Sequence, residues 1–99
     1  METELKNNNT THVITGALDA QMIGPTQKAF QDLLTENSGD ITLDLSTVDF
    51  MDSSGVGSIV YLHKRLVADN RTLSLLGLNG QPKKIIEFLR IDKIIKVIK

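Results

Sequence analysis

The chain has 99 residues, 40% of them apolar and none of them cysteine, so it suits one domain without disulfides or thiolate chemistry. Its net charge of -1 gives no reason to expect nucleic acid or an anionic membrane as a partner. No apolar run approaches the roughly 20 residues of a membrane span, and the start METELKNNN has no signal-peptide core. We therefore expect a cytoplasmic protein.

The first predicted elements are two strands joined by a polar turn. Leu5 indicates a short edge strand, and the polar run Lys6–Thr11 is typical of a hairpin-like turn. His12–Thr15 has the composition of a strand, and Gly16 is expected to end it. A loop then continues through Gly24-Pro25.

A helix and a second strand follow. From Thr26 onward, apolar residues recur on one face of a helix, at Ala29, Phe30, Leu33 and Leu34. Gly39 is well placed to stop this helix in a left-handed cap. Ile41–Ser46 then alternates apolar and polar residues, which predicts a strand with one packed face.

The second half of the chain continues the alternation of helix and strand. A second helix, ending near Asp69-Asn70, is indicated by Val56, Ile59, Val60, Leu66 and Val67. Thr72–Leu76 is a predicted strand, and Gly77–Gly80 a loop. Pro82 fits the first turn of a third helix. The inner face of this helix is predicted to hold Ile85, Ile86 and Leu89. Ile94–Ile98 is a last, strongly apolar strand.

The order of these elements, β-β-α-β-α-β-α-β, defines the expected fold class. Crossover helices between successive strands indicate an α/β protein with a mostly parallel central sheet of about five strands. The carboxyl ends of parallel strands meet at one edge of such a sheet, and open α/β folds usually keep their sites there.

The most informative stretch is DFMDSSGVGS, residues Asp49–Ser58, where a predicted strand becomes a helix. Asp52, Ser53 and Ser54 are all good N-cap residues, because their side-chain oxygens can accept bonds from the first helical amides. The two glycines of the stretch remove side chains from the opening turn, so a bulky group can approach the backbone. Free amides and the helix dipole also favour an anion at this position.

Three interpretations of this step compete. It is a capping cluster with glycines for close packing, a phosphate-accepting or interaction hydroxyl at Ser53 or Ser54, or an enzyme nucleophile. A serine nucleophile needs a base, and only His12 and His63 exist; His63 falls on the apolar row of its helix. The glycine spacing does not match a phosphate-binding loop, and nothing completes a metal site with the nearby aspartates. We therefore expect no enzyme, no cofactor and no metal.

Three stretches resemble a known family. LDLSTVDFMDSSGVGSIV, residues 43–60, closely resembles the central signature of the STAS domain of bacterial anti-sigma-factor antagonists. Gly16–Asp19 matches the G-x-L-D element of that family, and LLGLNGQPKKIIEFLRI, residues 75–91, resembles its later strand, loop and helix. The resemblance covers essentially the whole chain, so it implies a single STAS domain over residues 1–99 with the STAS-like fold.

The resemblance also implies a function, that of an anti-sigma factor antagonist in a partner-switching scheme. The unphosphorylated form binds and sequesters a GHKL-type serine kinase, often itself an anti-sigma factor. The kinase phosphorylates the serine directly after the aspartate, here Ser53 with Ser54 as second choice, and this phosphorylation releases the kinase. A PP2C-type phosphatase restores the complex. The implied partner-binding residues are Asp19, Met51, Asp52, Ser53, Ser54, Gly55 and Asn79.

Several alternatives stay open at this stage. Met51 is either an exposed contact or a core residue. The domain is alternatively a STAS module that binds a small ligand or a multiprotein assembly and is never phosphorylated. Many family members add a helix after the last strand, whereas this sequence ends at Lys99. An apolar flank there would be open to a partner or to weak dimerisation, with a monomer as the default.

Overall fold

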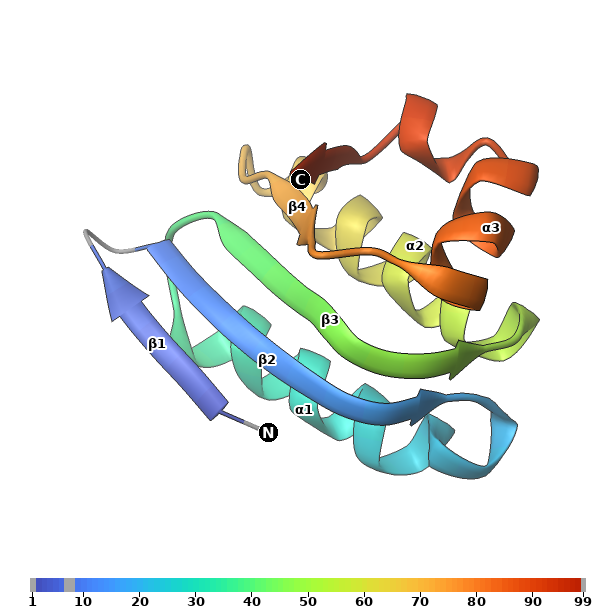
Figure 1. Cartoon of the computed structure of the whole chain (residues 1–99). Helices are drawn as coiled ribbons and strands as arrows, with labels where there is room; N and C mark the ends of the chain where they lie inside the picture. Colours follow the sequence, from blue (N-terminus) through green and yellow to red (C-terminus); the bar gives the residue numbers. More distant parts are fainter. Residues whose placement is uncertain (1, 7–8, 99) are drawn as a thin grey trace.

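The structure, a computed structural model that describes residues 2–6 and 9–98, is built on one five-stranded sheet (Figure 1). Its strands are β1 (Glu2–Lys6), β2 (Asn9–Leu18), β3 (Ile41–Met51), β4 (Leu73–Leu76) and β5 (Lys96–Ile98). They lie side by side in chain order; β1 is antiparallel to β2, and the other four strands are parallel. The predicted α/β class with a mostly parallel sheet is confirmed.

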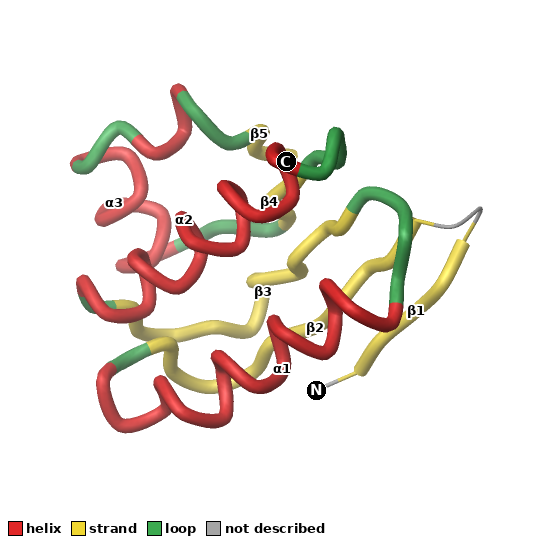
Figure 2. The backbone as a smooth tube through the Cα atoms, turned by 180° about the vertical axis from the view of Figure 1, so that it is seen from behind, coloured by secondary structure: helices red, strands yellow, loops and turns green. Residues whose placement is uncertain are grey.

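Three α-helices connect the parallel strands. They are α1 (Ile23–Glu36), α2 (Ser53–Ala68) and α3 (Gly80–Phe88), with short 3₁₀ turns η1 (Ala20–Met22) and η2 (Ile91–Lys93). Helices α1 and α2 cover the same face of the sheet, behind the strands in Figure 1 and in front of them in Figure 2. Right-handed crossovers between neighbouring strands produce this arrangement.

The core lies between the sheet and its helices. The largest fully buried side chains are those of Ile14, Leu18, Ile41, Leu43, Leu45, Met51, Ile59, Leu62, Leu66, Leu75, Ile86 and Ile95. The alternation predicted for Ile41–Ser46 is observed, because the apolar positions are buried and the polar ones are half-buried or exposed. Leu18 and Met51 are register partners, so β2 and β3 end side by side.

Strand β2 is longer than predicted and does not end at Gly16. The backbone of Gly16 has a φ of +83°, and the pairing with β3 shifts register between Gly16 and Ala17. The glycine therefore sits in a bulge, which bends a strand without ending it, and β2 continues to Leu18. The centre of the predicted polar turn, residues 7–8, lies outside the described residues.

Helix α1 differs from its prediction at both ends. It begins at Ile23, so that Gly24-Pro25 belongs to its first turn and not to a loop. Gly39 is not among the left-handed glycines, so the predicted glycine cap is wrong. The side chain of Asn37 instead donates from Nδ2 to the carbonyl of Leu33 at 3.1 Å, which satisfies one of the terminal carbonyls.

One predicted inner-face residue, Leu89, and one predicted strand boundary are wrong in the second half, and Val67, which helped to indicate α2, is not part of the core. Val67 is 52% exposed and Leu89, at the end of α3, is 47% exposed. Leu62, which the pattern did not select, is fully buried instead. Strand β5 begins at Lys96 and not at Ile94, because Ile94 and Ile95 form the turn after η2, where both of their amides donate to the carbonyl of Ile91. Ile94 remains 62% exposed.

Candidate functional site

Asp52 ties the start of α2 to the end of β2. Its Oδ1 accepts hydrogen bonds from the backbone amides of Ser54 and Gly55, at 2.9 and 3.1 Å. Its Oδ2 accepts from the amide of Ala20 at 3.1 Å, and its own amide donates to the carbonyl of Leu18 at 3.1 Å. The carboxylate therefore occupies the anion-favourable start of the helix, and of the three predicted N-cap candidates Asp52 is the one that caps α2.

Ser53 and Ser54, which the sequence could not distinguish, have different surroundings. Ser53 is the first residue of α2, is exposed, and makes no hydrogen bond through its hydroxyl to any described residue. Ser54 is half-buried, and its carbonyl accepts a hydrogen bond from the Ser58 hydroxyl at 3.0 Å. Of the two hydroxyls, that of Ser53 is the more accessible from solvent.

The two glycines at the start of α2 serve different purposes. Gly55 is buried, and a Cβ atom there would overlap the carbonyl of Leu18. This is the close helix–sheet packing predicted for the glycines. Gly57 is exposed, and a Cβ atom there would meet nothing within 4 Å. Packing therefore requires a glycine at position 55 and does not require one at position 57.

Gln81 braces the other side of the step and was missed from the sequence. Its Oε1 accepts from the amide of Met51 and its Nε2 donates to the carbonyl of Met51, both at 2.8 Å. This side-chain amide thus pairs like a neighbouring strand and fixes the first turn of α3 to the end of β3. Met51 itself is fully buried, so its predicted surface contact is wrong and the core alternative is correct.

Asp19 and Asn79 lie on opposite sides of this edge. Asp19 caps η1 by accepting from the amide of Met22 at 3.1 Å, directly beside the amide of Ala20 that Asp52 holds. Asp19 and Asp52 thus lie close together at the end of β2. Asn79 donates to the carbonyls of Ser46 and Gly77 at 3.0 and 2.9 Å. Its role in the structure is to hold the loop before α3.

Two exposed apolar residues near the step had not been selected from the sequence. Phe50 lies one residue before Met51 and is 45% exposed, and Met22 in η1 is 38% exposed. Phe50 is the register partner of Ala17 at the end of β2. No local sequence signal distinguishes Phe50 and Met22 from core residues.

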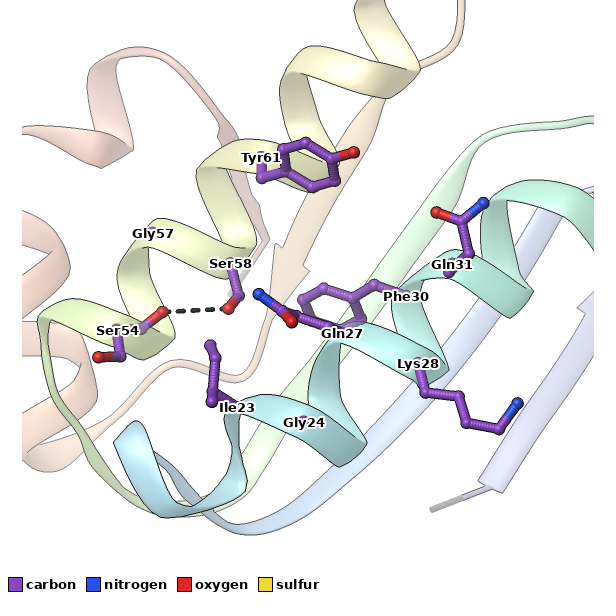
Figure 3. A pocket seen from close by; sticks show the side chains of 10 residues that line it. All are labelled: Ile23, Gly24, Gln27, Lys28, Phe30, Gln31, Ser54, Gly57, Ser58 and Tyr61. Atoms are coloured by element: carbon purple, nitrogen blue, oxygen red, sulfur yellow. Dashed lines mark hydrogen bonds between the residues drawn. The ribbon is translucent and has the colours of Figure 1, made fainter.

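A groove runs between α1 and α2 from the start of α2 (Figure 3). We call it the α1–α2 groove; it has a volume of about 740 Å³ and is lined by Ile23, Gly24, Gln27, Lys28, Phe30, Gln31, Ser54, Gly57, Ser58 and Tyr61. Tyr61 is half exposed and accepts a hydrogen bond from Nη1 of Arg65 at 2.9 Å. The groove thus begins beside the Ser53 step and continues along two helices.

Neither a metal centre nor a membrane span is found in the part of the chain that the structure describes. Among the side chains that the structure describes, those of residues 9–98, no group of three or more His, Asp or Glu could hold a metal ion. None of the helices formed by these residues is both long and apolar enough to cross a membrane. His63 is half-buried, with its Nδ1 shielded from solvent, as expected for the edge of the core.

Comparison with known proteins points to one family. The sequence matches the STAS domain family over residues 1–99. It is 27% identical over 97 residues to the anti-sigma-B factor antagonist of Listeria monocytogenes, with 95% of this chain and 85% of the relative covered.

Two solved structures share the fold. An anti-sigma factor antagonist from Mycobacterium paratuberculosis superposes with a TM-score of 0.86 at 15% identity, covering 97% of this chain and 81% of the other. The Bacillus cell fate determinant SpoIIAA in its phosphorylated form superposes with a TM-score of 0.74 at 19% identity, covering 99% and 90%. The chain belongs to the STAS domain family.

Proposed function

We propose that this protein is an anti-sigma factor antagonist that works by partner switching. Its unphosphorylated form binds and sequesters a GHKL-type serine kinase that is itself an anti-sigma factor. Phosphorylation of Ser53 by that kinase releases it, and a PP2C-type phosphatase restores the binding form. The relative from Listeria monocytogenes carries the name of such an antagonist, and it is similar over nearly the whole chain.

The observation that carries the proposal is the setting of Ser53. Its hydroxyl is exposed and makes no hydrogen bond to a described residue, while Asp52 beside it is held by three amides at 2.9 to 3.1 Å. A kinase therefore meets a free hydroxyl on a fixed backbone. Ser54 is the weaker acceptor because it is half-buried against the α1–α2 groove.

The same geometry supports a switch at the surface without a change of fold. A phosphate adds about -1.5 to -2 charges and three acceptor oxygens. The amides of Ser54 and Gly55 are already bonded to Asp52, so these two amides are not free to hold the phosphate. It stays on the surface beside Asp52 and Asp19. A partner shaped for a neutral serine then meets bulk and like charge.

The test uses purified GHKL-type serine kinases encoded in the genome from which the chain comes. Each kinase is incubated with ATP and with the wild type, Ser53→Ala or Ser54→Ala. Phosphopeptide mapping should place the phosphate on Ser53 in the wild type and Ser54→Ala, with none on Ser53→Ala. Binding measured without ATP should survive in Ser53→Ala and be lost in Ser53→Asp. If no kinase binds or modifies the chain, the partner-switching function is refuted and an unregulated binding module becomes the better description.

A further inference from the structure

We propose that the α1–α2 groove receives a bulky apolar side chain of the kinase, and that Gly57 is a glycine to leave room for it. The inference deepens the proposed function and rests on it, because the occupant belongs to the protein that binds Ser53. It adds a second contact, remote from the hydroxyl itself, to the surface on which binding depends.

The fold gives no reason for a glycine at position 57. Glycine inside a helix is less favourable than alanine, because it fixes a more flexible backbone. Gly57 lies within α2, has no positive φ, and would meet nothing within 4 Å if it carried a Cβ atom. Gly55, two residues earlier, shows the contrasting case of a glycine that packing demands. Because packing does not require a glycine at position 57, we attribute the missing side chain to the needs of a binding partner.

The position of Gly57 on α2 connects the groove to the phosphoacceptor. Ser53, Gly57 and Tyr61 are spaced by four residues, so they follow one another along a single face of the helix. All three are exposed. A partner that covers Ser53 and extends along α2 must therefore pass over Gly57 and then reach Tyr61.

The lining of the groove indicates an uncharged occupant. Its side chains are apolar or aromatic at Ile23, Phe30 and Tyr61, and uncharged polar at Gln27, Gln31, Ser54 and Ser58. Lys28 is the one charged residue in the lining, and its side chain extends away from α2 in Figure 3. Its Nζ forms an ion pair with Oδ2 of Asp32 at 3.7 Å. An aromatic or branched aliphatic side chain fits these surroundings without leaving a buried charge unpaired.

The shape of the groove favours a protein side chain over a small ligand. Small-molecule sites usually enclose most of their ligand. Here Tyr61 forms one wall and is 54% exposed, and Gly57 is open to solvent. An anchor that is itself attached to a larger surface needs no enclosure, since neighbouring contacts exclude water around it.

The experiment compares three variants against the kinase that phosphorylates Ser53, by calorimetry without ATP and by thermal melting. Gly57→Ala should raise Tm by about 4–8 °C through helix propensity, yet weaken binding. Gly57→Leu, which fills the groove, should weaken binding by about 30-fold, the effect of losing one strong anchor. Ala68→Leu places the same leucine side chain at an exposed residue of α2 outside the groove, and it should leave the affinity unchanged.

A second readout observes the groove directly. Tyr61 is the only tyrosine in the sequence, so 3-fluorotyrosine labelling gives a single ¹⁹F resonance from the groove wall. Adding the kinase should shift this resonance in the wild type and in Ala68→Leu. A resonance that instead changes with the concentration of the chain alone would assign the groove to a second copy and overturn the proposal.

The outcomes separate the two proposals. If Gly57→Leu binds the kinase as tightly as the wild type and is phosphorylated at the same kcat/KM, the groove is not a docking site, although the partner-switching function stands. If the wild type neither binds the kinase nor is phosphorylated, the function proposed above fails and the groove proposal fails with it.

Discussion

Replacing Asp52 with alanine removes the carboxylate that joins the start of α2 to the end of β2. The loss of an N-cap costs about 1 kcal/mol of stability. The hydrogen bond from the amide of Ala20 to the charged oxygen, at 3.1 Å and exposed to solvent, contributes about 1.5 kcal/mol, at the low end for charged acceptors. We therefore expect Asp52→Ala to lower the free energy of unfolding by about 2.5 kcal/mol, and Tm by about 10–20 °C.

Urea unfolding followed by far-UV circular dichroism measures this change, with an unaltered m-value as the sign that both states are otherwise intact. Asp52→Asn is the matched control. Asparagine caps helices as well as aspartate does, but its Nδ2 would face the donor of Ala20, so only the second contribution is lost. We expect this variant to fall between the wild type and Asp52→Ala. A loss below about 0.5 kcal/mol for Asp52→Ala would refute the bracing role.

Other substitutions test the remaining contacts by the same unfolding assay. Gly55→Ala should cost about 1–3 kcal/mol because its new Cβ atom overlaps the carbonyl of Leu18; an unchanged midpoint would contradict that contact. Gln81→Ala should lower the free energy of unfolding by about 1–3 kcal/mol, because it leaves the backbone of Met51 unpaired. Gln81→Glu keeps only the acceptor, so its stability should lie between those of the wild type and Gln81→Ala. Burial lowers the pKa of His12 below 6.5, so the unfolded chain takes up a proton first as the pH falls. Stability should therefore decrease below that pH, and His12→Gln should flatten the slope.

The features that could be predicted are those encoded in neighbouring residues. The alternation in Ile41–Ser46 and the Asp52-Ser53-Ser54 step identified β3 and the start of α2, and Asp52 was one of three candidate caps. Local patterns also produced the errors. Glycine often ends a strand, but the residues on either side of Gly16 continue to pair with β3. Gly39 follows a helix, as a capping glycine does, but the Asn37 side chain bonds the terminal carbonyl instead.

The contacts that could not be predicted depend on distant pairing. Gln81 and Met51 are 30 residues apart, and no spacing rule connects a glutamine in a first helical turn to the last residue of a strand. The exposure of Phe50 follows from where β2 and β3 end, not from its immediate neighbours. The different exposure of Ser53 and Ser54 likewise depends on α1, which is distant in sequence and forms the other wall of the groove that Ser54 lines.

The bracing on both sides of the step has a consequence for the speed of partner exchange. The two residues before Ser53 are clamped, Met51 by Gln81 and Asp52 by Leu18 and Ala20, so the serine is presented in one conformation before any partner arrives. Association then freezes little further backbone motion, and the free energy of the new contacts is not spent on ordering the loop. Differences in affinity between complexes would arise almost entirely in their dissociation rates. Under the proposed function, a serine presented in this way leaves the timing of the switch to the kinase and the phosphatase.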